Sequence, residues 1–343
     1  MTGYLRCAFV LTMVLGVGCG NPPAREVAPK ETPGPIKVGL LLDDLHERWE
    51  RDRALIAEVV DSMGAALQVE VADGDQARQL SQAEQMIASG VKALIVVAHD
   101  TEQAAPIVER AKAKGVAVIS YDRLIRHADV DLYLGFDPAT IGQLQAQYLL
   151  SRAPKGNYVL IGGAPTDGNA KAIREGQLRV LEPAIKKGAI RIVGDGWAEN
   201  WQASAAGQLT VAALDKARNR VVAILAPNDV TAGGAIEVLR SRGLAGKVLV
   251  SGQDAELAAA QRIVAGEQAM TVYKSLRTIT RLAARSAVLL ARGERVDTSA
   301  VVNNGFKDVP AMLFDPITID RDNLEAVLIG DGLHRREDVF GKQ

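Results

Sequence analysis

Short apolar runs alternate with amphipathic stretches along the chain from Ile36 onward, and this alternation constrains the fold more than any other feature. The first runs read IKVGLLL, LQVEVA, ALIVVA, VAVISY and LYLGF. Stretches with the apolar spacing of helices separate them, at 48–63, 77–89 and 102–114. Because nearly continuous apolar strands are buried on both faces, this pattern predicts a parallel sheet with helices on each side.

The same alternation then begins again. The runs NYVLIGG, IRIVGD, VVAILA and KVLVSGQ are separated by helical patterns near 170–187, 202–216 and 231–242. A further strand, AMTVY, precedes a long helical stretch at 276–291, and AMLFDPITI follows near the end of the chain. The sequence therefore predicts an α/β protein with two doubly wound parallel-sheet lobes of similar size.

Composition excludes several classes of function. The formal net charge is -1 and no basic block occurs, which argues against a nucleic-acid partner. The two cysteines, Cys7 and Cys19, both precede the predicted fold, so they can form neither an internal disulfide nor a nucleophile within it. The four histidines lack the spacing of metal ligands, and we expect no metal and no cofactor.

The N-terminal residues have the pattern of an export signal. Arg6 precedes the apolar stretch 7–17, which is too short to span a bilayer, and residues 1–18 are predicted to be a signal peptide. The sequence LGVGCG is similar to a lipobox, which makes Cys19 a candidate for acylation; cleavage as an ordinary signal peptide is the alternative. Residues 19–35, rich in proline and charge, are predicted to be a flexible tether.

Polar and aromatic residues follow the predicted strands, at the edge where open parallel sheets bind ligands. In the first half these residues are Asp43, Asp44, His99, Asp100, Asp122 and Arg123. In the second half they are Asp167, Asn169, Trp197, Trp201, Asn228, Asp229, Gln253, Asp254 and Lys274. Carboxylates accept hydrogen bonds, Arg and Lys donate them, and hydroxyl groups can satisfy both. Tryptophan faces attract C–H-bearing surfaces, so the set is suited to a sugar ring.

Seven ordered motifs carry a resemblance to a known family. DDLHERWERDR, SYDRLI, APTDGNAK, GDGWAENW, APNDVTAGGAI, SGQDAEL and MTVYK resemble, at similar spacings, motifs of the sugar-binding type I periplasmic substrate-binding proteins of ABC importers, and most closely the xylose-binding branch. The resemblance implies two lobes joined by a three-strand hinge. It implies a first lobe of residues 36–138 and 275–307, and a second lobe of 139–274 and 308–343.

The resemblance also implies a set of sugar contacts. Trp49 and Trp201 would stack on the sugar. The other implied contacts are Arg48, Asp122 and Arg123 in the first lobe, and Asp167, Asn169, Asn228, Asp254 and Lys274 in the second. The segment VVAHDTE departs from the family pattern, and the roles of His99 and Asp100 stay open.

The function implied is capture of a pentose, above all D-xylose, by a monomeric, non-enzymatic periplasmic protein that delivers it to an ABC permease in the inner membrane. Membrane attachment would occur only through a lipid on Cys19. One alternative is a sugar sensor that partners a membrane kinase or chemoreceptor; another is a different monosaccharide, such as ribose, arabinose, galactose or glucose. Structural alternatives are turn or capping roles for Asp167 and Asn169, and a surface ion pair between Asp122 and Arg123. Asn228 and Asp229 can both cap the helix that follows them, and we expect Asp229 to be the cap and Asn228 a sugar contact.

Overall fold

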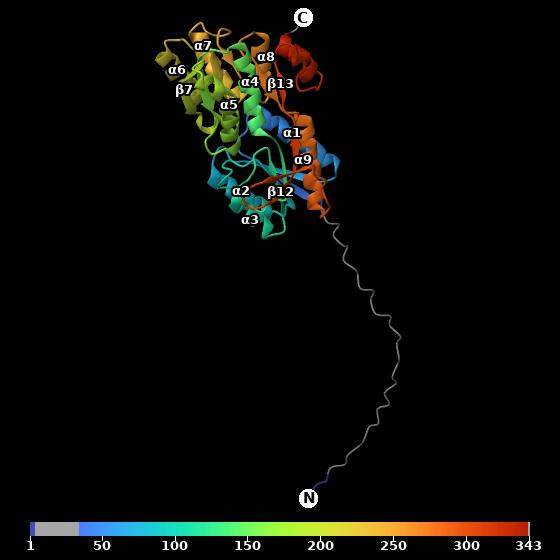
Figure 1. The fold of residues 1–343 in the computed structure, drawn as a ribbon. Helices are drawn as coiled ribbons and strands as arrows, with labels where there is room; N and C mark the ends of the chain where they lie inside the picture. Colours follow the sequence, from blue (N-terminus) through green and yellow to red (C-terminus); the bar gives the residue numbers. More distant parts are fainter. Residues whose placement is uncertain (4–33, 342–343) are drawn as a thin grey trace. The chain divides into compact units, whose positions relative to one another are not determined.

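A computed structural model describes residues 1–3 and 34–341 of the chain. Most of the predicted signal peptide, the lipidation candidate Cys19 and nearly all of the tether lie outside the described residues. From Pro35 onward the chain forms one compact unit of alternating strands and helices (Figure 1). Within the described ranges, we find no helix that is both long enough and apolar enough to cross a membrane.

The first lobe is built on a seven-stranded sheet with the order β11-β12-β5-β4-β3-β1-β2. Its strands are β1 (Lys37–Leu42), β2 (Ala66–Val71), β3 (Ala93–Val96), β4 (Ala117–Tyr121), β5 (Leu132–Phe136), β11 (Ala300–Asn303) and β12 (Asp308–Phe314). All neighbours pair in parallel except β11 and β12, which are antiparallel.

Helices cover both faces of this sheet, as the apolar strands require. The helices are α1 (Glu47–Ser62), α2 (Gln76–Ala88), α3 (Ala105–Lys112) and α9 (Leu276–Ala291). Leu40 packs in one cluster with Ile56 of α1 and Ile279 of α9. Its neighbour Leu41 packs in another cluster with Met86 of α2 and residues of α3. Successive strand residues point to opposite faces, so one apolar run supplies both layers of the core.

The second lobe repeats this plan on a smaller sheet. The parallel order is β7-β6-β8-β9, formed by β6 (Gly156–Gly162), β7 (Ile190–Trp197), β8 (Ala223–Leu225) and β9 (Leu249–Val250). Strands β10 (Thr271–Tyr273) and β13 (Ile317–Ile319) form an antiparallel pair. The helices are α4 (Pro138–Arg152), α5 (Gly168–Lys186), α6 (Ala203–Ala217), α7 (Asp229–Ser241), α8 (Leu257–Val264) and α10 (Arg336–Phe340), with short helical turns at Glu199–Trp201 and Glu325–Ile329.

The chain passes between the two sheets three times, which confirms the predicted fold class. The passages run from β5 to α4, from β10 to α9, and from β12 to β13. Residues 308–314, which the prediction gave to the second lobe, instead form β12 in the large sheet, where Ala311 pairs with Tyr133 of β5. The difference arises because 304–307 is a hairpin turn, closed by the hydrogen bond Asn304 N→Lys307 O of 3.1 Å, and both hairpin strands stay in one sheet.

Close packing between α4 and α5 generates a prediction about stability. A Cβ added at Gly176 would collide with the carbonyl oxygen of Ala139 on the facing helix, so Gly176→Ala must push the two helices apart. We expect the free energy of unfolding to fall by about 2 kcal/mol, the usual cost of overpacking a core. Urea denaturation measures this. Gly207→Ala in α6, where a Cβ meets no atom closer than 3.4 Å, is the matched control and should leave stability unchanged or raise it. Equal stability of wild type and Gly176→Ala would contradict the expectation.

Candidate functional site

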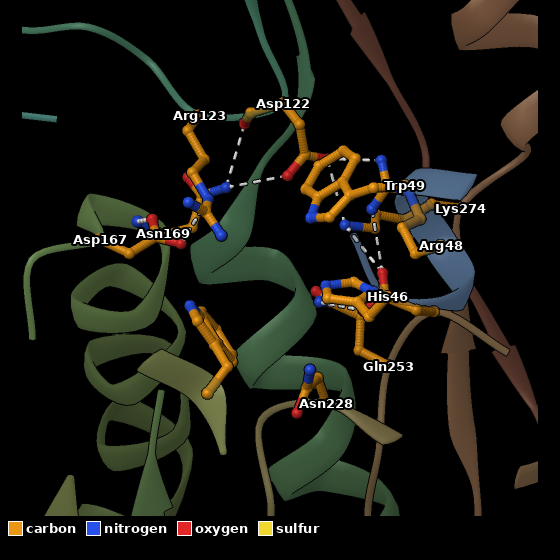
Figure 2. Close-up of a pocket in the computed structure, with 12 residues that line it drawn as sticks. His46, Arg48, Trp49, Asp122, Arg123, Asp167, Asn169, Asn228, Gln253 and Lys274 are labelled. Atoms are coloured by element: carbon orange, nitrogen blue, oxygen red, sulfur yellow. Dashed lines mark hydrogen bonds and ion pairs between the residues drawn. The ribbon is translucent and has the colours of Figure 1, made fainter. Parts of the chain in front are cut away.

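The loops at the carboxyl ends of both sheets meet around one cavity, whose empty space is about 340 Å³ including the part open to solvent (Figure 2). Its wall is formed by His46, Arg48, Trp49, Asp122, Arg123, Asp167, Asn169, Trp201, Asn228, Gln253, Asp254 and Lys274. All ten residues proposed from the sequence lie in this wall, and His46 and Gln253 complete it. The structure therefore brings together in space a set that is spread over most of the chain.

Three of the wall residues have left-handed backbone conformations. The φ angles of Asp122, Trp201 and Asp254 are 62°, 58° and 94°. Such angles are unfavourable for residues other than glycine and persist only where the surrounding structure enforces them. The turn at Asp122 is held by its own N–H, which donates to Leu134 O at 2.7 Å, and by Arg123 N, which donates to Tyr121 O at 2.7 Å. The loops thus aim these side chains at the cavity at a conformational cost.

Four buried charges form a closed ring along one side of the cavity. Arg48 donates from Nη2 to Asp122 Oδ1 and from Nη1 to Asp254 Oδ1, both at 3.0 Å. Lys274 Nζ lies 3.1 Å from each of the same two oxygens. Two cations and two carboxylates therefore alternate around the ring. Because Arg48 and Asp122 come from the first lobe and Asp254 from the second, the ring also connects the lobes.

The ring keeps its carboxylates ionised. Burial alone would raise the pKa of Asp122, but Lys274 and Arg48 outweigh burial and hold that pKa well below its usual range. The pKa of Asp254 is lowered by the same two cations against the effect of burial. In both residues the cations share Oδ1, while the only contact of Oδ2 within residues 34–341 is a 3.4 Å one with an amide, from Asn169 or Gln253. Each Oδ2 therefore keeps capacity to accept a strong hydrogen bond.

Arg123 forms a second bridge between the lobes. Its Nη1 donates to Asp43 Oδ2 at 2.6 Å and to Ala98 O at 2.9 Å, and its Nε lies 2.7 Å from Asp167 Oδ2. A guanidinium carries five N–H donors; the two hydrogen bonds from Nη1 use two of them, and the contact with Asp167 is an ion pair. Both hydrogens on Nη2 lack a partner among the residues that the structure describes. This pair can reach two neighbouring oxygens of a bound molecule.

Two indole rings complete the wall and also carry unused donors. Trp49 is 3% and Trp201 8% exposed, and the Nε1 atom of each is buried without a hydrogen-bond partner in the described part of the chain. Arg48 lies 4.5 Å from the ring centroid of Trp49 in a cation–π contact. Buried donors are almost always paired in proteins, so these two indole N–H groups are unusual among the residues that line the cavity.

Asp167 and Asn228 do cap helices, and capping does not use all of their polar atoms. Asp167 caps α5, because its Oδ1 accepts from Asn169 N at 2.8 Å while its Oδ2 binds Arg123. Asn228, and not Asp229 as expected, caps α7: its Oδ1 accepts from Thr231 N at 3.0 Å, whereas the Asp229 carboxylate accepts from Gln268 and Thr271. The amide nitrogen of Asn228 has no hydrogen bond within the described residues and remains available. The alternative of a surface pair between Asp122 and Arg123 is wrong: both are buried, and each pairs with other residues.

Sequence reasoning missed part of the site. His46 and Gln253 line the cavity, and Asp43 anchors Arg123 from behind it. Asp43 lies directly after β1 and Gln253 three residues after β9, and this place at a strand end was their only signal in the sequence. His46 precedes α1 and gave no signal of its own. Trp197, the last residue of β7, is 39% exposed and lies outside the cavity wall, with Arg174 over its ring at 5.0 Å.

Comparison with known proteins gives consistent matches over nearly the whole chain. Residues 38–295 match the model of the periplasmic binding protein domain. The D-xylose-binding periplasmic protein of Haemophilus influenzae is 45% identical over 89% of this chain and 92% of its own length. The Escherichia coli protein of the same name is 42% identical over the same shares. A carbohydrate transporter solute binding protein from Chloroflexus aurantiacus, solved with D-glucose, is 35% identical, with a TM-score of 0.83 over 88% of this chain and 97% of that one.

The contact between Trp201 and the backbone generates a prediction about the cavity. A Cβ at Gly163 would overlap the indole of Trp201, so Gly163→Ala must displace the ring. We expect the tryptophan emission of the unliganded protein to shift to longer wavelength, because a ring that is now 8% exposed moves toward water. The same substitution in a Trp201→Phe background should leave the emission unchanged. A shift that persists in that background would show that Gly163→Ala acts on another tryptophan.

Proposed function

Because this chain belongs to the periplasmic binding protein family, we propose that it captures a pentose, above all D-xylose, in the cavity between its lobes and delivers the sugar to an ABC transporter. The observation that carries the proposal is the cavity wall itself. Two indoles, unpaired donors and ionised carboxylates converge there from both lobes. The names of the similar proteins support D-xylose as the sugar and a transporter as the recipient.

A monosaccharide matches the wall in chemistry. Each hydroxyl can donate to a carboxylate oxygen while it accepts from an Arg, Lys or indole N–H. In the first lobe, Arg48, Asp122 and Arg123 would hold hydroxyls. In the second lobe, Asp167, Asn169, Asn228, Asp254 and Lys274 would do so. Trp49 and Trp201 would lie against the C–H faces of the ring, where their quadrupoles favour it.

Recognition would select against sugars that lack a required hydroxyl. A missing hydroxyl leaves a buried charged or polar group without its partner, which costs far more than the lost contact itself. A micromolar dissociation constant corresponds to roughly 8 kcal/mol. Binding energy of that size is accessible to a small ligand that forms several charge-assisted hydrogen bonds.

The contacts between the lobes support capture by closure. Besides the two charge bridges, Gly168 N donates to Thr101 Oγ1 at 3.1 Å and Leu257 N donates to Glu47 Oε1 at 3.1 Å. These contacts can form only when the lobes are together. A sugar that touches both lobes binds the closed arrangement better and shifts the population toward it. The lobes would move about the three passages between the sheets, near 137, near 274–275 and near 315–316.

The cellular setting follows from the same proposal. The family is periplasmic by name, and export through the signal peptide at 1–18 would bring the protein there. Acylation of Cys19 would attach it to a membrane through the tether of residues 19–35. The protein would act as a monomer and without catalysis, since delivery of an unchanged sugar requires neither a partner subunit nor a reaction.

A ligand panel tests the proposed function. Protein from residue 20 onward should be stabilised against thermal unfolding by D-xylose more than by ribose, arabinose, galactose or glucose, because only the matching hydroxyl pattern pairs every buried group. Calorimetry should give a micromolar or tighter dissociation constant for the preferred sugar. Preference for another monosaccharide would correct the ligand. If no monosaccharide raises the unfolding temperature, the function is wrong.

Two substitutions test the assignment of the cavity. Trp201→Ala and Arg123→Ala should each weaken binding of the preferred sugar by about a hundredfold, because each removes contacts to the ring or two charge-assisted donors. Loss of the buried indole should also lower the unfolding temperature of sugar-free Trp201→Ala, so binding is compared at a temperature where this variant is folded. Trp197→Ala, which changes an exposed tryptophan outside the wall, is the matched control and should bind as the wild type does. Unaltered binding in both cavity variants would place the site elsewhere.

A further inference from the structure

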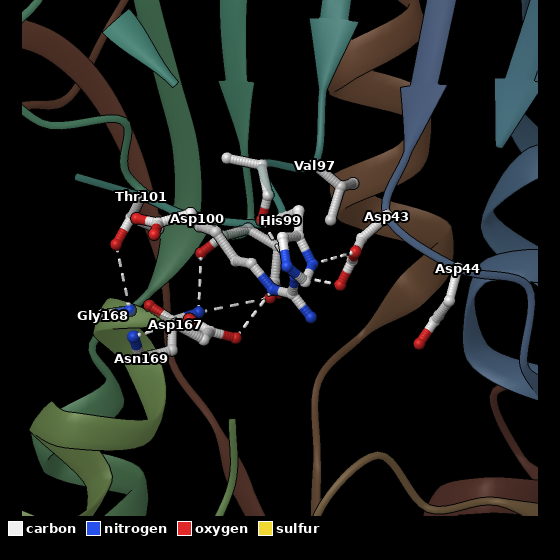
Figure 3. Close-up of polar contacts among 12 residues, drawn as sticks. Asp43, Asp44, Val97, His99, Asp100, Thr101, Asp167, Gly168 and Asn169 are labelled. Atoms are coloured by element: carbon white, nitrogen blue, oxygen red, sulfur yellow. Dashed lines mark hydrogen bonds and ion pairs between the residues drawn. The ribbon is translucent and has the colours of Figure 1, made fainter. Parts of the chain in front are cut away.

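His99 lies behind the cavity, at the outer end of a row of buried polar groups (Figure 3). Its Nδ1 is 2.7 Å from Asp43 Oδ1, and the other oxygen of Asp43 accepts from Arg123 Nη1 at 2.6 Å. Arg123 Nε in turn meets Asp167 Oδ2 at 2.7 Å. The side chains of Asp43, Arg123 and Asp167 are 7%, 5% and 2% exposed, and that of His99 is 11% exposed. His99 itself is not part of the cavity wall.

The position of His99 is set by the loop after β3. Its backbone N–H donates to Gln79 Oε1 at 3.0 Å, and Gln79 also donates to Val97 O at 2.9 Å. The next residue, Asp100, closes the following turn by accepting from Glu102 N at 2.8 Å. The imidazole therefore projects from a fixed backbone. The carbonyl of Ala98 in the same loop accepts from Arg123, so one loop contacts the guanidinium directly and through Asp43.

The contacts of Arg123 show how its guanidinium is held in one orientation. Asp43 and Ala98 O accept hydrogen bonds from Nη1, and Asp167 forms an ion pair with the guanidinium on the side of Nε. With Nη1 hydrogen-bonded on one side and Nε ion-paired on the other, the plane of the guanidinium is fixed, and the Nη2 pair is left for the ligand. If Asp43 were free to turn, Arg123 could draw both of its oxygens into a bidentate pair, and the plane would rotate.

We propose that His99 is a positioning residue for sugar binding: it holds one oxygen of Asp43 so that the other fixes the guanidinium of Arg123 with its Nη2 hydrogens toward the sugar. The inference rests on the proposed function, since it names the sugar as the molecule that Arg123 meets. His99 acts through Asp43 and Arg123 and has no contact with the sugar.

The charge of the imidazole reinforces this hold. The hydrogen bond to Asp43 raises the pKa of His99, against the effect of burial. The pKa of Asp43 is lowered, because Arg123 and His99 outweigh the burial of its carboxyl. The other charged groups around the imidazole are Arg123, Asp100, Asp44 and Asp75. A protonated His99 would complete a row of alternating charges, His99, Asp43, Arg123 and Asp167, comparable to the ring around Lys274.

Calorimetry with D-xylose tests the proposal. We expect His99→Ala to weaken binding about tenfold, which corresponds to one charge-assisted hydrogen bond. His99→Gln, whose amide can still donate to Asp43, should recover most of that loss. His127→Asn is the matched control, because His127 is an exposed histidine that pairs with Glu102 away from the cavity wall, and it should bind as the wild type does. Wild-type affinity in His99→Ala would overturn the proposal.

A double-mutant cycle separates positioning from a general structural effect. If His99 acts through Asp43, then His99→Ala should cause no further loss of affinity in an Asp43→Asn background, whereas independent effects would add. A full tenfold loss in that background would overturn the proposal. Should wild-type protein bind none of the monosaccharides in the panel, the proposed function fails instead, so the two failures are distinguishable.

An NMR titration of the histidines provides a readout that does not depend on affinity. The pKa of His99 should lie above the ordinary value in the wild type and fall toward it in Asp43→Asn, because the partner charge is gone. An unchanged pKa for His99 in Asp43→Asn would show that the two side chains are not coupled, and would overturn the proposal.

Discussion

Buried charge is the constraint on which the rest of this structure depends. Removing a carboxylate or a guanidinium from water is costly, and the cost is recovered only by close pairing. Here the pairing runs across the gap between two lobes: Arg48 joins Asp122 to Asp254, and Arg123 joins Asp43 to Asp167. The lobes therefore do not merely enclose a cavity. They neutralise each other's charges around it, and the unused donors and acceptors remain for a ligand.

The two sheets make this arrangement possible. Parallel strands end at a common edge, so residues far apart in the chain, such as Trp49 and Asp254, reach the same cavity. The residues that reach the cavity lie beyond the ends of the strands, and three of them, Asp122, Trp201 and Asp254, have left-handed φ angles. The strands fix where these residues lie, and the strained turns fix where their side chains point. Energy gained in the packed layers supports the unfavourable backbone at the site.

The alternation of apolar runs was enough to predict the sheets, because a buried parallel strand has to be apolar on both faces. It did not predict that residues 308–314 stay in the large sheet, since a hairpin return and a passage to the next lobe both follow a turn at Asn304. The ten predicted site residues meet at one cavity because strand ends and motifs marked them. The roles of Asp43 and His99 were not predicted, because they arise from contacts between residues far apart in the chain, Asp43 with Arg123 and His99 with Asp43. Such pairs leave no local pattern in a sequence.

A crystal structure of the protein with bound D-xylose tests the central claim most directly. The account predicts the sugar between the lobes, with hydroxyl oxygens at hydrogen-bond distance from Arg123 Nη2 and from the free oxygens of Asp122 and Asp254, and with ring or hydroxyl oxygens near the two indole N–H groups. The two charge bridges should be intact around it. A sugar bound outside this cavity, or one bound while Arg123 and Asp254 remain separated from their partners in the other lobe, would contradict the account.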